Sequence, residues 1–258
     1  MTDPIALPQT PSFRLDGRRA LITGAGRGLG LAMSAALAEY GADVVLAARS
    51  GDQVETVAQA IRARGQQAEA FVLDVTDTAR VDEEIAARGP FQILVNNAGM
   101  NRPALLVDVT EEDYDTVTDT NVRSAVFVAR AVVKGLIDAG LPGSIINISS
   151  QMGHVGGPKR PVYCATKHAI EGLTKAMAWE LGEHGIRVNT ICPTFVETPM
   201  TAKMLEDASF REMVTEKIAL GRIGQIDDVM GAVVYLASDA SSLVTGSSLM
   251  VDGGWTAA

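Results

Sequence analysis

The sequence has few of the features that mark secreted, membrane-spanning or nucleic-acid-binding proteins. Its 258 residues include only two cysteines, Cys164 and Cys192, which are too few for a disulfide framework and belong to no metal-ligand pair. We therefore expect a reducing, cytoplasmic setting and no bound metal. No uninterrupted run reaches the roughly 18 apolar residues of a membrane span. Acidic residues outnumber basic ones by 31 to 22, and the net charge of −9 argues against nucleic acid or an anionic membrane surface as a partner.

The N-terminus also lacks the pattern of an export signal. Met1–Pro11 contains three prolines and has no basic segment followed by an apolar one. We expect residues 1–12 to form a flexible arm. Residues 13–258 contain no repeat and no low-complexity linker, so we expect them to form a single domain.

Short β-rich runs alternate with amphipathic helical stretches along most of the chain. Strands are predicted at Arg19–Thr23, Asp43–Ala47, Ala68–Leu73, Phe91–Val95, Ser144–Ile148 and Arg187–Ile191, and a final edge strand within Ser247–Trp255. Helices are predicted at Leu29–Tyr40, Asp52–Arg64, Thr78–Arg88, Asp113–Ala139 and Val162–Glu183. The alternation predicts an α/β protein, in which a mainly parallel, doubly wound sheet of about seven strands is covered by helices on both faces.

A glycine-rich loop joins the first predicted strand to the first helix. Its residues are Thr23-Gly24-Ala25-Gly26-Arg27-Gly28-Leu29-Gly30, which fit the spacing Thr-Gly-x-x-x-Gly-x-Gly. Glycines let the backbone turn sharply and approach a pyrophosphate, while the helix N-terminus offers free N–H groups. The alternative is a tight turn without a ligand. With this loop the chain resembles the short-chain dehydrogenase/reductase family, which implies a Rossmann fold and a nicotinamide dinucleotide.

The end of the second strand indicates which dinucleotide is bound. A carboxylate at this position would bind the ribose 2′-hydroxyl of NAD. The chain has Ala47-Ala48-Arg49-Ser50 instead, and Arg27 adds a second cation. A guanidinium fits a 2′-phosphate, and such a charge-assisted bond contributes roughly 1.5–3 kcal/mol. We therefore expect a preference for NADP, with NAD as the alternative if Arg49 is only a solvated residue at a helix start.

Tyr163 and Lys167 lie four residues apart near the start of a long predicted helix, so they share one face. Ser150 lies thirteen residues before the tyrosine, at the end of the fifth strand. Together with Asn121 these residues match the catalytic set of the family in order and spacing. Ser149 is the competing hydroxyl, but the family spacing favours Ser150.

The residue types suit the interconversion of an alcohol and a ketone. A tyrosine can donate a proton to a forming alkoxide or, as a phenolate, accept one from an alcohol. Lowering its pKa from about 10 toward about 7 requires roughly 4 kcal/mol, which we expect from the ammonium of Lys167 and a positive nicotinamide. The resemblance further implies that Ser150 polarises the carbonyl and that Asn121 positions a water leading from Lys167 to solvent.

The resemblance also assigns further cofactor contacts at strand ends. It places Asp74 at the adenine amino group, the Val75 backbone at the adenine ring, Asn97–Gly99 at the ribose and nicotinamide side, and Val196 with Thr198 at the carboxamide. The predicted cofactor-binding residues are Gly24, Gly26, Arg27, Gly28, Leu29, Gly30, Arg49, Asp74, Val75, Asn97, Ala98, Gly99, Tyr163, Lys167, Val196 and Thr198.

The loop from Gln151 to Arg160 follows the predicted catalytic serine and is the candidate substrate loop. His154 could donate to a substrate hydroxyl or carboxylate, or be an ordinary loop residue whose hydrogen bonds are satisfied within the protein. Lys159 and Arg160 are either solvated charges or cations that attract an anionic substrate. The predicted substrate-binding residues are Ser150, Gln151, His154 and Tyr163.

Residues 194–218 are a candidate lid over the substrate. The apolar residues of this segment fit a flexible cover, although packing on the sheet would use the same residues: Met200, Met204, Leu205, Phe210 and Met213. Thr194 stands where the family usually has a glycine after a proline, so its backbone must avoid positive φ.

Three functions fit the sequence. The first is an NAD(P)-dependent oxidoreductase that acts on a sugar, polyol or sugar acid, as in the gluconate-type members of the family. The second is a 3-oxoacyl-carrier-protein reductase, but Trp179 occupies one of two basic docking positions, and only Lys134 matches the other. The third is an idle nucleotide-binding scaffold, against which the complete catalytic set argues.

Two surfaces predict a homotetramer. The helices Asp113–Ala139 and Val162–Glu183 are apolar on more than one face, and in the family they pair across a two-fold axis. The C-terminal strand within Ser247–Trp255 meets its counterpart across a second axis in the family. Two such interfaces close into a D₂ tetramer, with Trp179 buried in or at the rim of the helical one.

Overall fold

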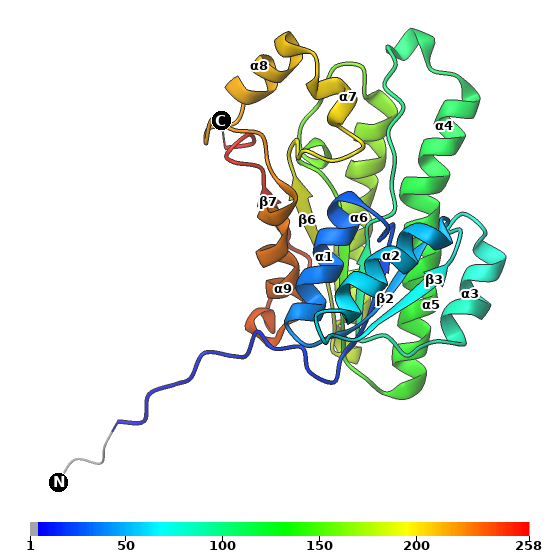
Figure 1. The fold of residues 1–258 in the computed structure, drawn as a ribbon, viewed down its shortest axis with the longest axis vertical. Coiled ribbons are helices and arrows are strands. Elements are labelled where there is room, and N and C mark those ends of the chain that lie inside the picture. The colour runs from blue at the N-terminus through cyan, green and yellow to red at the C-terminus, as the bar shows by residue number, and fades with distance from the viewer. Residues whose placement is uncertain (1–4, 258) are drawn as a thin grey trace.

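The computed structural model describes residues 5–257, which form an α/β protein around one seven-stranded parallel sheet (Figure 1). The strand order is β3-β2-β1-β4-β5-β6-β7, so the chain reverses its direction of winding between β1 and β4. This confirms the predicted doubly wound Rossmann fold. The strands are β1 (Arg19–Thr23), β2 (Asp43–Ala48), β3 (Ala68–Val72), β4 (Ile93–Asn96), β5 (Gly143–Ile148), β6 (Ile186–Pro193) and β7 (Ser248–Val251).

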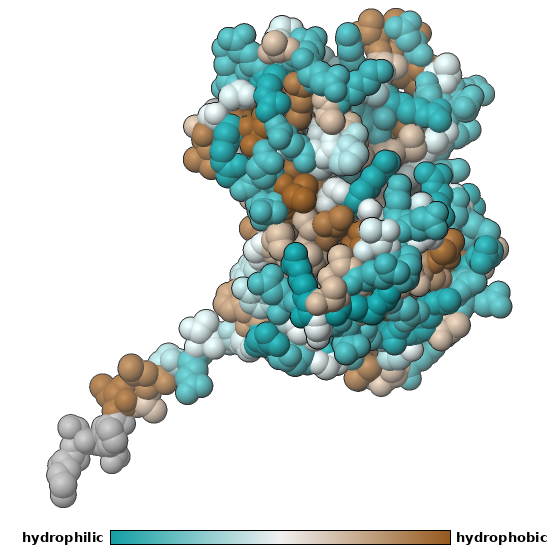
Figure 2. All heavy atoms as spheres, in the orientation of Figure 1, coloured by the Kyte–Doolittle hydropathy of each residue, from teal (hydrophilic) through white to brown (hydrophobic). Residues whose placement is uncertain are grey.

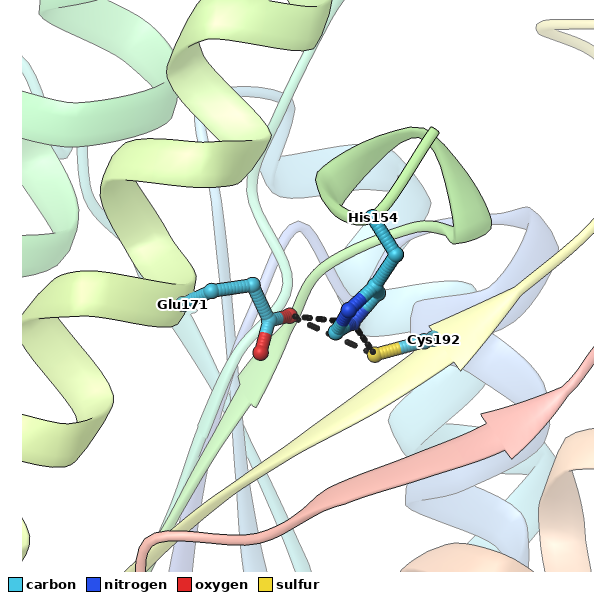
Figure 3. Close-up of side chains that lie close together, drawn as sticks. All are labelled: His154, Glu171 and Cys192. Atoms are coloured by element: carbon cyan, nitrogen blue, oxygen red, sulfur yellow. Dashed lines mark hydrogen bonds and ion pairs between the residues drawn. The ribbon is translucent and has the colours of Figure 1, made fainter. Parts of the chain in front are cut away.

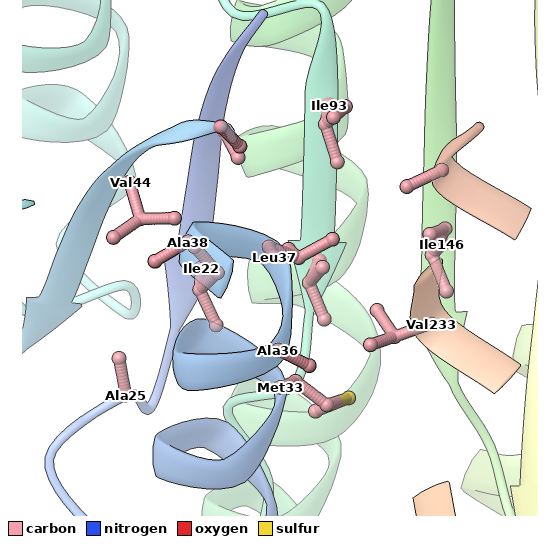
Figure 4. Packing of buried hydrophobic residues seen from close by; sticks show 14 of the residues in the cluster. Ile22, Ala25, Met33, Ala36, Leu37, Ala38, Val44, Ile93, Ile146 and Val233 are labelled. Atoms are coloured by element: carbon pink, nitrogen blue, oxygen red, sulfur yellow. The ribbon is translucent and has the colours of Figure 1, made fainter. Parts of the chain in front are cut away.

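Helices cover both faces of the sheet, and each face has its own apolar core. The helices are α1 (Gly28–Glu39), α2 (Gly51–Arg62), α3 (Thr78–Ala86), α4 (Glu111–Thr118), α5 (Ser124–Ala139), α6 (Pro161–Leu181), α7 (Ala202–Leu205), α8 (Ala208–Glu216) and α9 (Met230–Ala237). On one face α1, α2 and α9 pack together, and Figure 4 shows Met33 and Leu37 of α1 beside Ile22 and Val233. On the other face α3, α5 and α6 pack against the opposite side chains of the same strands.

The prediction of one uninterrupted helix over Asp113–Ala139 is wrong. Residues Asp119–Arg123 form a π-helical turn between α4 and α5, and this turn contains Asn121. A π-turn inserts one residue into the helical repeat, and such turns often occur at functional sites. The apolar periodicity is that of a helix on both sides of the turn, so the sequence pattern did not reveal it.

Two further differences concern the C-terminal third of the chain. The apolar stretch predicted as one helical lid consists of the two helices α7 and α8. The carboxylate of Asp207 separates them, because it accepts hydrogen bonds from the backbone N–H groups of Ser209 and Phe210 and so begins α8. The helix α9 was not predicted, although it completes one of the two apolar cores.

The N-terminal segment leaves the body of the protein as an extended chain. Residues 5–12 contain no helix or strand and are exposed, and Figure 2 shows brown, apolar residues within this arm. The part of the predicted arm formed by residues 1–4 lies outside the described residues. Among the described helices, none combines the length and the apolar character needed to cross a membrane.

Arg187 of β6 connects the sheet to the end of α9. Its guanidinium donates to the backbone oxygens of Leu236 and Ser238 and to the hydroxyl of Ser241, at 2.9–3.2 Å. Arg187→Met would remove these charge-assisted hydrogen bonds between β6 and the end of α9, so we expect the free energy of unfolding to fall by about 2–4 kcal/mol. Denaturant unfolding measures this loss. Arg64→Met, at an exposed position after α2, is the control and should change stability little; equal stability of both variants would contradict the assignment.

Candidate active site

A cavity of about 260 Å³ lies beyond the carboxyl ends of β5 and β6, between the loop before α6 and the segment around α7. This is where open parallel sheets bind ligands. The lining residues are Asn101, Pro103, Ser150, Gln151, Met152, Arg160, Tyr163, Thr194, Phe195, Met200, Thr201, Lys203 and Met204. Three of the four predicted substrate-binding residues, Ser150, Gln151 and Tyr163, therefore line this cavity.

The start of α6 positions Tyr163 and Lys167. Pro161 occupies the first turn, where its missing N–H does not weaken the helix. The helical repeat then places Lys167 one turn beyond Tyr163, with its Nζ 5.6 Å from the centre of the tyrosine ring. The buried ammonium donates a hydrogen bond of 2.8 Å to the backbone oxygen of Ile148 at the end of β5. The strand thus holds the lysine beneath the tyrosine.

The expected lowering of the Tyr163 pKa depends on a positive nicotinamide as well as on Lys167, and in the chain alone the pKa shifts upward. Burial raises the pKa of Tyr163, and hydrogen bonding to Ser150 and the charge of Arg160 oppose this only in part. Burial also lowers the pKa of Lys167 to about 8. Both shifts have the same origin, because removal from water disfavours the charged form of either group.

Ser150 rather than Ser149 lines the cavity. The hydroxyl of Ser150 donates to Oε1 of Gln151 at 2.6 Å and accepts from the backbone N–H of Met152 at 3.1 Å. It therefore sits at the start of a short helical turn that fixes its orientation. Ser149 is also buried, but it is not among the residues that line the cavity.

The π-turn directs the side chain of Asn121 toward the loop after β4. Its amide oxygen accepts from the N–H of Met100 at 2.8 Å, and its amide nitrogen donates to the oxygen of Met100 and to the hydroxyl of Thr166. A Cβ atom built at Gly99 would lie 3.3 Å from Asn121 and 3.9 Å from Nζ of Lys167. The structure therefore brings Asn121 close to Lys167, across Gly99.

The glycine loop turns sharply and packs closely against its own backbone. Gly24 and Gly28 have positive φ angles of 64° and 56°. A Cβ atom at Gly30 would lie 2.3 Å from the backbone oxygen of Gly24, so no other residue fits there. Asn97 holds the loop in place, since its amide donates to the backbone oxygens of Thr23 and Gly24.

The N-terminus of α1 fits a bound phosphate. Arg27 makes no side-chain hydrogen bond to cap the helix, and the first turn contains no acidic residue. The N–H groups at the helix end are therefore available to an anion. Thr198 lies against Gly28, with its Cβ 3.6 Å from a Cβ built there, and the neighbouring Val196 is buried.

The ends of β2 and β3 bring Arg49 near Asp74. Although burial alone would raise the pKa of Asp74, hydrogen bonds from Thr76 and the charge of Arg49 lower it. A carboxylate and a cation are thus both available at this edge of the sheet. Val75, beside Asp74, is buried with the apolar core.

His154 was predicted to contact the substrate, but it does not line the cavity. Figure 3 shows it converging with Glu171 and Cys192; its Nε2 lies 3.5 Å from both Oε1 of the acid and Sγ of the thiol. Burial raises the pKa of Cys192 to about 12, so the thiol stays protonated. It lies 3.3 Å from Oε1 of Glu171, to which it donates.

Sequence reasoning missed Glu171, which is buried on α6. Burial would raise its pKa, but hydrogen bonds from neighbouring groups, including Ser248 at 2.6 Å, keep it below the ordinary value. Its spacing of four residues from Lys167 was the available signal, since it continues the face shared with Tyr163. The cavity residues Asn101 and Lys203 had no comparable signal.

Known proteins resemble this chain over most of its length. The family model described as "Enoyl-(Acyl carrier protein) reductase" matches residues 24–256. Gluconate 5-dehydrogenase of Gluconobacter oxydans is 41% identical, over 95% of this chain and 96% of its own. L-xylulose reductase of Bos taurus is 39% identical, over 95% and 99% of the two chains.

A solved structure with a similar fold is that of a gluconate 5-dehydrogenase from Burkholderia cenocepacia in complex with NADP and tartrate. It has a TM-score of 0.92 and 41% identity, and the match covers 95% of this chain and 98% of that one. Together with the family model and the curated relatives, this similarity identifies the family. The chain belongs to the short-chain dehydrogenase/reductase family.

Proposed function

We propose that the chain is an NADP-dependent oxidoreductase that interconverts a secondary alcohol and a ketone on a sugar, polyol or sugar acid. One observation carries this proposal: Ser150 and Tyr163 line the same cavity wall, with Lys167 buried one helical turn behind the tyrosine. The names of the relatives, gluconate 5-dehydrogenase and L-xylulose reductase, support the substrate class. The NADP in the Burkholderia structure supports the cofactor.

The residues of the chain divide the proton chemistry between them, while NADP, when bound, supplies or accepts the hydride. Tyr163 donates its hydroxyl proton to the carbonyl oxygen during reduction and takes it back during oxidation. Its raised pKa keeps the phenol protonated, which suits the donor role. Ser150 donates a hydrogen bond to the same oxygen and orients it.

Lys167 and Asn121 act behind the tyrosine. The ammonium of Lys167, held by the oxygen of Ile148, places positive charge beneath the phenol and stabilises it when it ionises. Asn121 holds the backbone at Met100 close to the lysine. We assign both as the remaining members of the catalytic set.

The cofactor site follows the ends of four neighbouring strands. The glycine loop and the N-terminus of α1 hold the pyrophosphate, and Arg49 and Arg27 hold the 2′-phosphate. Asp74 and Val75 face the adenine, and Asn97–Gly99 lie along the ribose and nicotinamide. The other proposed contacts are Gly24, Gly26, Gly28, Leu29, Gly30, Tyr163, Lys167, Val196 and Thr198.

A 3-oxoacyl-carrier-protein reductase is the second candidate, and a relative of that name from Thermotoga maritima, 39% identical to this chain, supports it. The dock expected for an acidic carrier protein is poorly developed here. Lys134 pairs with Asp138 at 2.6 Å, and Trp179 occupies the other position. The cavity of about 260 Å³ is also small compared with typical pockets of roughly 300–1,000 Å³. We therefore rank this function second.

We further propose that residues 13–258 act as one domain, with residues 194–218 as the substrate lid and residues 1–12 as an arm. Two described helices, α7 and α8, lie in the lid, and Met200 and Met204 face the cavity from it. The free thiols of Cys164 and Cys192 support a cytoplasmic location.

We infer a homotetramer built through α4–α6 and the C-terminal strand β7. Trp179 on α6 is 92% exposed in the single chain, which is unusual for so large an apolar side chain. Tyr114 on α4 is also exposed. A second copy of the chain would remove these side chains from water.

Replacement of Tyr163 tests the proposed chemistry. Tyr163→Phe removes the proton donor and little else, so kcat should fall by about three decades or more while NADPH binding is kept. Turnover and NADPH fluorescence titration measure the two effects. Tyr40→Phe, at a partly exposed position after α1, should behave like the parent protein. A Tyr163→Phe enzyme with a tenth of the parent activity would show that another group donates the proton.

Replacement of Arg49 tests the cofactor preference. Arg49→Asp exchanges a phosphate partner for a carboxylate, so the ratio of kcat/KM for NADP to that for NAD should fall by about 10- to 100-fold. Steady-state kinetics with both cofactors give this ratio. Arg64→Asp introduces the same charge change at an exposed position after α2 and should leave the ratio unchanged. An unchanged ratio for Arg49→Asp would rule out the phosphate contact.

Replacement of Trp179 tests the assembly. Trp179→Arg would place a charge in the proposed helical interface, so the tetramer should dissociate at concentrations at which the parent protein stays assembled. Light scattering coupled to size exclusion measures the mass. Ala63→Arg, exposed at the end of α2, is the control. A parent protein that is monomeric and active when dilute would contradict the proposal.

A further inference from the structure

The candidate cavity is electropositive within an acidic protein. Two cations, Arg160 and Lys203, line it, and none of its lining residues is an aspartate or glutamate. The chain as a whole carries a net charge of −9. Cations gathered at a concave site attract anions to it.

Arg160 is the more informative of the two cations because it is buried, with only 7% of its surface exposed. Its guanidinium carbon lies 5.3 Å and 5.8 Å from the ring centres of Phe195 and Phe210, and its Nη2 lies 3.2 Å from Sδ of Met204. Within residues 5–257 no carboxylate forms an ion pair with it.

These contacts leave most of the hydrogen-bonding capacity of the side chain unused. A guanidinium has five N–H donors, and a thioether is a weak acceptor. Burying a charge costs several kcal/mol unless it is paired. A methionine or leucine would pack against the two phenylalanines without that cost. The position therefore points to an anion that pairs with Arg160 during the working cycle.

Two other buried polar atoms on the cavity wall also lack partners. Oδ1 of Asn101 and Oγ1 of Thr194 make no hydrogen bond to the described part of the chain. Buried polar atoms are nearly always paired, by protein or by a ligand. Both residues line the same cavity as Arg160. The free polar groups of the cavity therefore match a molecule that carries hydroxyls as well as a negative charge.

The end of the cavity at Arg160 lies close to Tyr163. Arg160 precedes Tyr163 by three residues, directly before α6. Its charge lowers the pKa of the Tyr163 hydroxyl, against the larger effect of burial. A substrate whose carbonyl contacts Tyr163 and Ser150 can therefore extend toward the guanidinium.

We propose that Arg160 binds the terminal carboxylate of the substrate, with Asn101 and Thr194 binding its hydroxyls, so that the enzyme acts on a sugar acid rather than on a neutral sugar or polyol. This inference rests on the proposed function and narrows its substrate class. The planar fork of a guanidinium matches a carboxylate with two parallel hydrogen bonds. Lys203, from α7, adds a second positive charge at the same cavity.

Three six-carbon probes that differ only at the group on C1 test the proposal: D-gluconate, D-glucitol and D-glucitol 1-phosphate. Their binding to the full-length protein is measured by calorimetry, with and without saturating NADP. We expect gluconate to bind about 10- to 100-fold more tightly than glucitol. Arg160→Met should abolish this preference and leave the affinity for glucitol within about threefold. Arg160→Lys, which keeps the charge but not the planar fork, should retain part of it.

Lys159→Met is the matched control, because Lys159 is the adjacent cation, is exposed and does not line the cavity. It should keep the full preference for gluconate. Thermal unfolding and NADPH titration establish that each variant is folded. Equal binding of gluconate and glucitol to the parent protein, or a preference that survives in Arg160→Met, would overturn the proposal. Tighter binding of the phosphate ester than of gluconate would overturn the assignment of a carboxylate.

The same measurements separate this inference from the proposed function. If the parent enzyme binds NADPH and turns over neutral sugars without preferring the acid, the proposed function stands and the carboxylate site is refuted. If the protein binds no NADPH, the proposed function is refuted. The gluconate titration without cofactor still tests the role of Arg160 in that case.

Discussion

The reversal of strand order between β1 and β4 is the constraint on which the site depends. The loops after these two strands must leave in opposite directions to reach their helices, which opens a crevice at the carboxyl ends. The hydroxyl of Thr23 spans this point, because it accepts hydrogen bonds from the backbone N–H groups of Asn97 and Ala98 at 3.0 Å. The glycine loop and the loop after β4 are thereby fixed relative to one another, and both border the proposed cofactor site.

Helix α6 carries the proposed reacting groups and is joined to the sheet by hydrogen bonds. Tyr163, Lys167 and Glu171 follow one another at intervals of four residues on one face, so a single rigid element places a phenol, an ammonium and a carboxylate in line. Partners from β5 and β6 hold the two deeper groups, since Lys167 donates to Ile148 and Glu171 accepts from Thr190 at 3.1 Å. Hydrogen bonds to the sheet thus hold both charged side chains in place, which is the preorganisation that proton transfer requires.

Burial sets the electrostatics of this part of the molecule. It raises the pKa values of Tyr163 and Cys192 and lowers those of Lys167 and Arg160, so each group is driven toward its neutral form. Glu171 is the exception, because hydrogen bonds from its neighbours outweigh the loss of water. The cations Arg160 and Lys203 that line the cavity are therefore not opposed by any carboxylate among its lining residues.

The sequence by itself determined the fold class and the candidates for the reacting groups. The period of apolar residues distinguished strands from helices, the glycine spacing located the tight loop before α1, and the four-residue interval placed Tyr163 and Lys167 on one face. All of these are local properties of the chain. Tertiary structure decided the π-turn at Asn121, the pairing of His154 with Glu171 and Cys192, the direction of the Tyr163 pKa shift and the burial of Arg160. Each of these depends on which distant segments exclude water from a side chain, and the sequence pattern of one segment carries no information about that.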